Sequence, residues 1–113
     1  MTRIYKLVSR GEWQAAKASG AFLGAAVDLA DGYIHFSTGA QAVETARKYF
    51  AGLSDILIVG FEAEALGPGL KWEPSRGGDL FPHLYRPLDP ALAVEERDAP
   101  LGDDGHIQLG DLV

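Results

Sequence analysis

Residues 55–61 read DILIVGF and form the most apolar run of the chain. Val, Ile and Phe are enriched in β-strands, and a continuous apolar run of this length is typical of a strand that is buried on both faces. We therefore predict that residues 55–61 form a central, buried strand.

A strand followed by a helix is predicted at the start of the chain. Residues 3–8 (RIYKLV) are rich in residues that favour strands. Ser9 precedes Glu12 by three residues, which is the spacing of a helix capping box. This spacing predicts a helix over residues 10–19, which Gly20 would close.

A second strand–helix unit follows it. Residues 33–37 (YIHFS) are predicted to form a strand, and Thr38 is a predicted helix N-cap with Gln41 as its capping-box partner. Gly52 would end this helix. The apolar residues that recur at helical spacing within it are Val43, Ala46, Phe50 and Leu53. Between the two units, residues 21–30 (AFLGAAVDLA) fit either a short strand or a turn of helix.

The C-terminal half is predicted to hold two more strands and an ordered loop. Residues 70–73 (LKWE) follow a Gly-Pro-Gly turn and form a short strand. Residues 74–90 contain four prolines and two glycines, which exclude a regular helix, but they are too apolar for a free linker. We predict an ordered loop there that covers a cleft. Residues 91–97 fit a last strand, with a helix as the alternative, and the tail from about residue 99 is predicted to be mobile at its end.

These elements predict a single α+β domain over residues 1–113, with a small split sheet, mixed or antiparallel, and two helices. The absence of cysteine excludes disulfides, cysteine-based zinc sites and a cysteine nucleophile. Ten basic and 16 acidic residues give a net charge of −6 without a basic cluster, which argues against general nucleic-acid binding. The N-terminus resembles no secretory signal, and no apolar run approaches about 20 residues, so we expect a cytoplasmic protein without a membrane span.

Residues 33–37 also carry the first candidate site. Strand alternation gives this segment an apolar face and a polar face, and the polar face is made of Tyr33, His35 and Ser37. The polar face is either solvated surface or the lining of a cleft. In the second case Ser37, Thr38 and the free N–H groups of the following helix would bind an anionic group.

Two further sets of residues are candidates. Glu73 follows Trp72, and its pKa would be raised if both side chains were covered, although a surface carboxylate is the alternative. His83 and Tyr85 lie in a loop stiffened by prolines, as in a ligand clamp or in a purely structural plug. Two histidines and a carboxylate, here His35, His83 and Glu73, would suit a catalytic zinc ion. They lack local ligand spacing, so we predict no metal site.

Four blocks of sequence occur in an order that resembles a known family. They read DGYIHFST (31–38), TARKYF (45–50), LKWE (70–73) and FPHLY (81–85). From IYKLVS to about residue 94 the chain resembles the small bacterial family DUF952, a domain of unknown function. The last block of that family usually continues FPHLYG, whereas Arg86 follows here. A side chain at this position would either block the close approach of a ligand or contact its phosphate.

The resemblance implies a fold similar to that of the ADP-ribosyltransferases, which bind NAD in a cleft between two small sheets. It implies that Lys6 stands where the first strand of that superfamily bears Arg or His, and that Glu73 orients the ribose. The residues that match the block contacting nicotinamide are Gly32, His35, Phe36 and Ser37.

The predicted site residues follow from these arguments together. The predicted catalytic residues are His35, Glu73 and His83. The predicted substrate-binding residues are Lys6, Tyr33, Ser37, Thr38, Trp72, Tyr85 and Arg86. The predicted function is an enzyme that transfers ADP-ribose or another glycosyl group, with NAD or a related nucleotide as the substrate. The alternatives are a non-catalytic module that binds a small ligand or peptide in the same pocket, and an antitoxin-like partner protein. The identity of the substrate, the physiological partner and the oligomeric state stay open.

Overall fold

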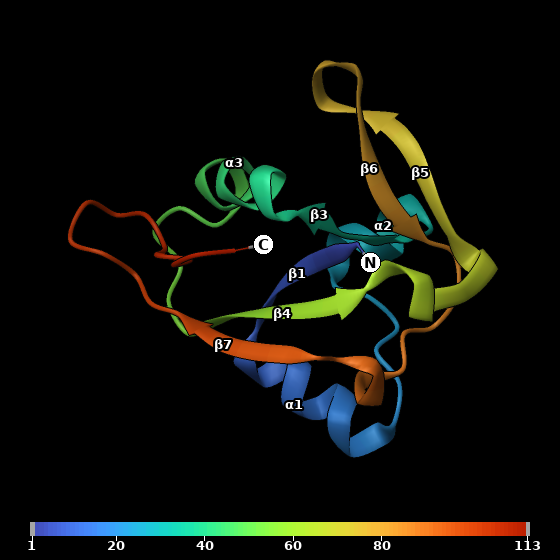
Figure 1. Ribbon diagram of the computed structural model, residues 1–113. Coiled ribbons are helices and arrows are strands. Elements are labelled where there is room, and N and C mark those ends of the chain that lie inside the picture. Colours follow the sequence, from blue (N-terminus) through green and yellow to red (C-terminus); the bar gives the residue numbers. More distant parts are fainter. Residues whose placement is uncertain (1, 113) are drawn as a thin grey trace.

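The computed structural model describes residues 2–112, with the side chain of Arg76 excepted. Within these residues it contains seven strands and three α-helices (Figure 1). The strands are β1 (Arg3–Ser9), β2 (Ile34–His35), β3 (Ser37–Thr38), β4 (Ile56–Glu62), β5 (Leu70–Ser75), β6 (Asp79–Leu84) and β7 (Glu95–Ala99). The α-helices are α1 (Arg10–Ser19), α2 (Ala26–Asp31) and α3 (Gly39–Tyr49). Short 3-10 helices are η1 (Ala63–Gly69), η2 (Arg76–Gly78) and η3 (Pro90–Leu92).

The larger of two sheets has the strand order β3-β1-β4-β7, and all of its neighbouring pairs are antiparallel. β4 pairs with β1 along its whole length and with β7 on its other side. Residues 56–61 are all buried. The predicted central buried strand is therefore confirmed, with the difference that it begins at Ile56 and extends to Glu62.

Each face of the larger sheet carries an apolar layer. α1 packs Trp13 and Ala16 against one face, and α3 packs Ala42 and Ala46 against the other (Figure 1). Trp13 is completely buried, and its ring meets that of Phe61 nearly at a right angle, with 6.1 Å between the centroids. Burial of an aromatic ring of this size contributes a large share of the core.

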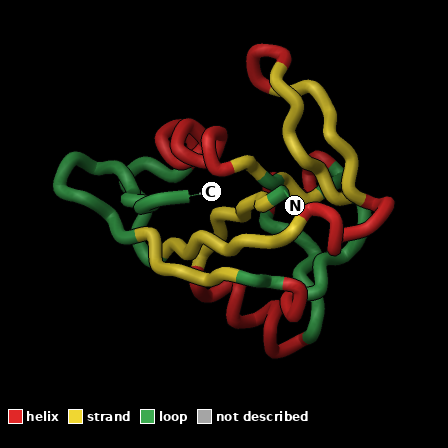
Figure 2. The backbone as a smooth tube through the Cα atoms, in the orientation of Figure 1, coloured by secondary structure: helices red, strands yellow, loops and turns green. Residues whose placement is uncertain are grey.

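The C-terminal segment adds to the layer on the α3 side. It is loop for most of its length (Figure 2), yet it buries the side chains of Ile107 and Leu109 in that layer. The tail that was predicted to be mobile from about residue 99 therefore contributes to the core, while Val113 lies outside the described residues.

The two predicted helices form, and their N-terminal caps are confirmed. The hydroxyl of Ser9 accepts from the backbone N–H of Glu12 at 3.2 Å, and Gly20 closes α1 in a left-handed conformation with φ 89°. Thr38 and Gln41 form the predicted capping box of α3, with N–H to oxygen distances of 3.2 and 3.0 Å. Among the described residues no helix is long and apolar enough to cross a membrane.

The buried face of α3 differs from the prediction. Val43 is 50% exposed and Leu53 is 47% exposed, whereas Ala42 is fully buried beside Ala46. The small alanine side chains allow the helix to lie close to the sheet, and the larger residues therefore point outward. The helix also ends at Tyr49, before the predicted end at Gly52.

A third helix, α2, corrects the prediction of two. Residues 21–30 had left strand and helix open, and Ala26–Asp31 forms the helix. Its N-cap residue, Ala25, has no side chain that could cap it. The carboxylate of Asp28 replaces such a cap by accepting from the backbone N–H of Ala25 at 2.8 Å. Because residue 25 is not one of the usual N-cap residues, the sequence of residues 21–30 gives only a weak signal for a helix.

The smaller sheet corrects the predicted loop over residues 74–90. Its strand order is β2-β6-β5, and Asp79–Leu84 forms the middle strand. Pro82 lies within that strand opposite Trp72, and its carbonyl accepts from the N–H of Phe36 at 3.0 Å. Pro82 has no N–H with which to return this bond to the carbonyl of Phe36, and the pairing of β2 with β6 ends one residue earlier, at His35. The hairpin of β5 and β6 projects from the body of the domain (Figure 1).

The segment 33–38 also differs from the single strand that was predicted. β2 belongs to the smaller sheet, in which Ile34 and His35 pair with Leu84 and His83. β3 belongs to the larger sheet and pairs with β1. Phe36 stands between them and is buried in the core. The chain thus crosses here from one antiparallel sheet to the other, which confirms an α+β fold with a split sheet. The last strand, predicted at residues 91–97, is found at residues 95–99.

Candidate active site

A cleft of about 460 Å³ lies between the two sheets and α3. Its lining combines polar residues that the sequence singled out with a set of aromatic rings. The predicted site residues in the lining are Lys6, Tyr33, His35, Ser37 and His83. The further aromatic residues in the lining are Tyr5, Phe36, Tyr49, Phe50 and Phe81.

A buried ion pair forms one end of the site. Nζ of Lys6 lies 3.0 and 2.9 Å from the two carboxylate oxygens of Asp28, and only 5% and 1% of these residues are exposed. Burial disfavours the charged form of Asp28, but the hydrogen bond with His35 and the charge of Lys6 outweigh it and lower the pKa of Asp28 to about 2. Burial also lowers the pKa of Lys6, and the charge of Asp28 partly offsets this effect.

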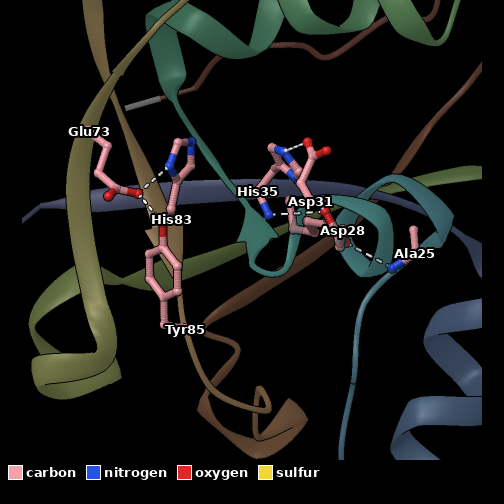
Figure 3. Close-up of polar contacts among 8 residues, drawn as sticks. Ala25, Asp28, Asp31, His35, Glu73, His83 and Tyr85 are labelled. Carbon is pink, nitrogen blue, oxygen red and sulfur yellow. Dashed lines mark hydrogen bonds and ion pairs between the residues drawn. The ribbon is translucent and has the colours of Figure 1, made fainter.

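The imidazole of His35 lies between two carboxylates (Figure 3). Its Nδ1 is 2.6 Å from Oδ1 of Asp28, and its Nε2 is 2.9 Å from Oδ2 of Asp31. Because carboxylate oxygens only accept, a ring that makes both contacts donates from both nitrogens and offers no lone pair to a ligand. The backbone N–H of His35 also donates to Asp28, at 3.1 Å. Residues of α2 thus hold the His35 side chain in place, and both of its ring nitrogens have a hydrogen-bond partner.

His83 has a different environment, on the side of the smaller sheet (Figure 3). Its Nδ1 is 2.8 Å from Oε1 of Glu73, and the hydroxyl of Tyr85 donates to the same oxygen at 2.6 Å. The hydrogen bonds from Tyr85 and His83 lower the pKa of Glu73, and the bond to Glu73 raises the pKa of Tyr85 to about 12. A raised pKa for Glu73, as expected from cover by Trp72, is not found, because neighbouring residues of a strand point to opposite faces.

Tyr33 joins the two histidines into one aromatic cluster. Its ring is stacked on that of His83, with 4.1 Å between the centroids and an interplanar angle of 29°. The ring of His35 lies 4.6 Å from that of Tyr33 and 5.6 Å from that of His83. The sequence suggested a shared face for Tyr33 and His35 and named His83 as a separate candidate, and the pairing of β2 with β6 is what brings the three rings together.

Five predicted site residues lie outside the lining of the cleft. They are Thr38, Trp72, Glu73, Tyr85 and Arg86. Glu73 and Tyr85 reach the site through His83, whereas Thr38 caps α3 and Trp72 is 39% exposed on β5.

Arg86 neither enters the cleft nor blocks it. Its Nη2 and Nε donate to the carbonyl of Leu66 at 2.6 and 3.1 Å, so the guanidinium fixes the η1 segment to the end of β6. Arg86 lines a separate, smaller cavity of about 260 Å³ on the far side of Tyr33, which lines both cavities.

Asp28 and Asp31 are the site residues that the sequence interpretation missed. Asp28 is the only charged residue of residues 21–30, and Lys6 stands alone in the apolar segment IYKLV. A charged residue in an apolar segment is buried only when it is paired. Two such residues of opposite charge, Lys6 and Asp28, could therefore have suggested an ion pair. Among the described residues, no group of three or more His, Cys, Asp or Glu could hold a metal ion.

The chain has relatives with solved structures. The crystal structure of protein CC0527 from Caulobacter crescentus is similar to it with a TM-score of 0.94 and 58% sequence identity, over 97% of this chain and 96% of that chain. The solution NMR structure of CC0527 has a TM-score of 0.87 at 58% identity, over 98% of this chain and 96% of that chain. No curated protein matches. The family model described as "Protein of unknown function (DUF952)" matches residues 7–96, so the chain belongs to the DUF952 family.

Proposed function

We propose that this protein binds NAD or a related nucleotide in the cleft and transfers its ADP-ribosyl or glycosyl group, as an ADP-ribosyltransferase-like enzyme. The observation that supports this proposal best is the position of the cleft. It lies at the split between two antiparallel sheets, and the paired strands β2 and β6 bring stacked aromatic and imidazole rings to its wall.

The size and the lining of the cleft suit a nucleotide. Its volume of about 460 Å³ falls within the range of small-molecule sites, and apolar and aromatic side chains make up most of its wall. The nicotinamide ring of NAD is planar and positively charged. The faces of aromatic rings attract such a cation, and the carboxylate of Asp31 in the lining would add to the attraction.

Hydroxyl groups in the lining suit the ribose. The hydroxyl oxygens of Ser37 and Thr45 lie 3.1 Å apart, and Ser75 lines the cleft from the hairpin. Lys6 forms an ion pair with Asp28. In this proposal it therefore helps to hold α2 and His35 in place and does not bind a phosphate.

A titration with NAD tests the binding part of this proposal. We expect NMR amide signals of residues 33–38 and 81–86 to shift, and we expect Tyr33→Ala to weaken the Kd for NAD at least tenfold, because the variant removes the ring at the centre of the cluster. Trp72→Ala is the matched control, since it removes an aromatic ring that lies outside the lining. Unmoved signals in both segments would contradict the proposal.

Turnover tests the enzymatic part. Wild-type protein should release nicotinamide from NAD, with water or an added hydroxyl compound as the acceptor. Binding of NAD without any release would favour the non-catalytic module instead, and it would leave the ligand assignment intact.

A further inference from the structure

We infer that His83 is the group that accepts the proton of the attacking acceptor in the cleft, and that Glu73, held by Tyr85, positions it for that role. This inference rests on the proposed function. It assigns Glu73 a different role from direct contact with the ribose, because Glu73 does not line the cleft.

The hydrogen bond between His83 and Glu73 fixes which nitrogen can accept. The carboxylate oxygen accepts, so Nδ1 of His83 donates across the 2.8 Å contact. In a neutral ring the other nitrogen, Nε2, then carries a lone pair. No hydrogen bond to Nε2 of His83 is present among the described residues, and His83 lines the cleft although only 3% of it is exposed. A carboxylate that orients an imidazole in this way leaves its other nitrogen available to a reactive group in the cleft.

His35 is excluded from the same role by its two partners. Its Nδ1 faces Asp28 and its Nε2 faces Asp31, so a ring that makes both contacts has no lone pair to offer. The two histidines lie on paired strands with 5.6 Å between their rings, and of these two His83 is the one with a ring nitrogen that has no hydrogen-bond partner among the described residues.

Two direct contacts and one indirect contact hold His83 in place. Tyr33 stacks on its ring, Glu73 binds its Nδ1, and Tyr85 donates to the same oxygen of Glu73. Because Glu73 and Tyr85 act through His83, they are positioning residues. Glu73 and His83 come from the neighbouring strands β5 and β6, whose register sets Lys71 opposite His83 and Glu73 opposite Phe81.

The proposed reaction breaks one bond to C1′ of the ribose and forms another. The bond between C1′ of the ribose and the nicotinamide nitrogen breaks, and its electron pair leaves with nicotinamide. An oxygen of the acceptor, an alcohol or water, forms the new bond to C1′. The proton of that oxygen passes to Nε2 of His83 and then to solvent. With water as the acceptor the products are ADP-ribose, nicotinamide and a proton.

Side-chain ¹⁵N NMR of the histidines tests the geometry without any need for turnover. In its neutral form we expect His83 to carry its proton on Nδ1, with an unprotonated Nε2. The variant Glu73→Ala should change it to the form protonated at Nε2, whereas Glu44→Ala, which removes an exposed carboxylate on α3, should leave it unchanged. Protonation of Nε2 in the wild-type protein would overturn the inference, whether or not NAD binds.

Nicotinamide release tests the role in the reaction. We expect His83→Gln to lower kcat at least a hundredfold, and Glu73→Ala at least tenfold with less than a twofold change in KM. Glu44→Ala should retain the wild-type rate. A wild-type rate in His83→Gln would overturn this inference and leave the proposed function standing, whereas wild-type protein that binds NAD without cleaving it would overturn both the inference and the enzymatic proposal. If His83→Gln does not fold, Glu73→Ala carries the test, because its NMR signature and its rate are measured on the same sample.

Discussion

Replacement of Asp28 by asparagine is expected to destabilise the protein by between about 2 and 5 kcal/mol at pH 7, because it leaves the ammonium group of Lys6 buried without its counter-charge. The lower figure comes from Asp28 itself. Its pKa falls from an ordinary value of 3.8 to about 2, and this difference corresponds to about 2 kcal/mol in favour of the charged form.

The upper figure comes from Lys6. A buried ammonium without a partner can lose its proton, and removal of that proton at pH 7 from a group with an ordinary pKa of 10.5 costs about 5 kcal/mol. The cost cannot rise much beyond this value, because the neutral amine is then the more stable form. A domain of this size has a total stability of about 5–15 kcal/mol, so the loss is large enough to measure and leaves room for a folded variant.

The effect also depends on pH in a defined direction. The pKa of Asp28 is lowered in the folded protein, so its contribution is present above pH 3.8 and is lost as the pH falls through about 2. The gap in stability between wild type and Asp28→Asn should therefore stay nearly constant from pH 7 to about pH 4 and shrink below that, by about 2 kcal/mol once the pH reaches about 2.

Urea unfolding followed by tryptophan fluorescence measures these differences, because Trp13 is fully buried and becomes exposed on unfolding. Asp31→Asn is the matched control, because the side chain of Asp31 is 46% exposed and bonds to the other nitrogen of His35, so it should cost less than about 1 kcal/mol. Addition of Lys6→Met to Asp28→Asn should restore part of the loss. The reasoning would be refuted if Asp28→Asn were no less stable than Asp31→Asn at pH 7.

Two further predictions concern backbone positions. Gly24→Ala should cost about 2–4 kcal/mol in urea unfolding, since Gly24 has φ 124° and a Cβ there would lie 2.8 Å from Cβ of Asp28, whereas Gly77→Ala, with φ 71° and no atom within 4 Å, should cost only about 1–2 kcal/mol. Equal losses at the two glycines would contradict the argument from close approach. Thr38→Ala should cost about 1 kcal/mol by removal of the α3 cap, and Val43→Ala, at an exposed position of the same helix, should change the stability by less than about 0.5 kcal/mol.

The elements that could be predicted are those whose signal is local. The caps at Ser9 and Thr38 and the apolar run at residues 55–61 each act within a few residues, so α1, the start of α3 and β4 follow from the sequence. A capping hydroxyl satisfies a backbone N–H wherever the rest of the chain lies. A fully apolar run likewise needs burial on both faces in any fold.

The elements that could not be predicted depend on distant partners. Pro82 and its neighbours look like a loop by composition, and they form a strand because β5 and β2 supply the hydrogen bonds on either side. The pair of Lys6 and Asp28 joins residues that are 22 positions apart. No local rule gives the register that brings them together. For the same reason a shared polar face could suggest that Tyr33 and His35 lie in one site. It could not show that Glu73 binds His83 and stays outside the lining of the cleft.

The crossing at Phe36 is the feature that turns these distant pairings into one site. β2 and β3 are each two residues long and could not be stable as isolated strands, so the larger strands on either side hold them. Phe36 is buried between them, with its ring nearly perpendicular to that of Phe61 at 5.6 Å. His35, before this anchor, pairs in the smaller sheet, and Ser37, after it, pairs in the larger sheet. Because residues two apart along an extended chain point to the same face, both side chains line the cleft. The cleft therefore lies where the chain changes sheets, and its polar residues come from both sides of a single buried phenylalanine.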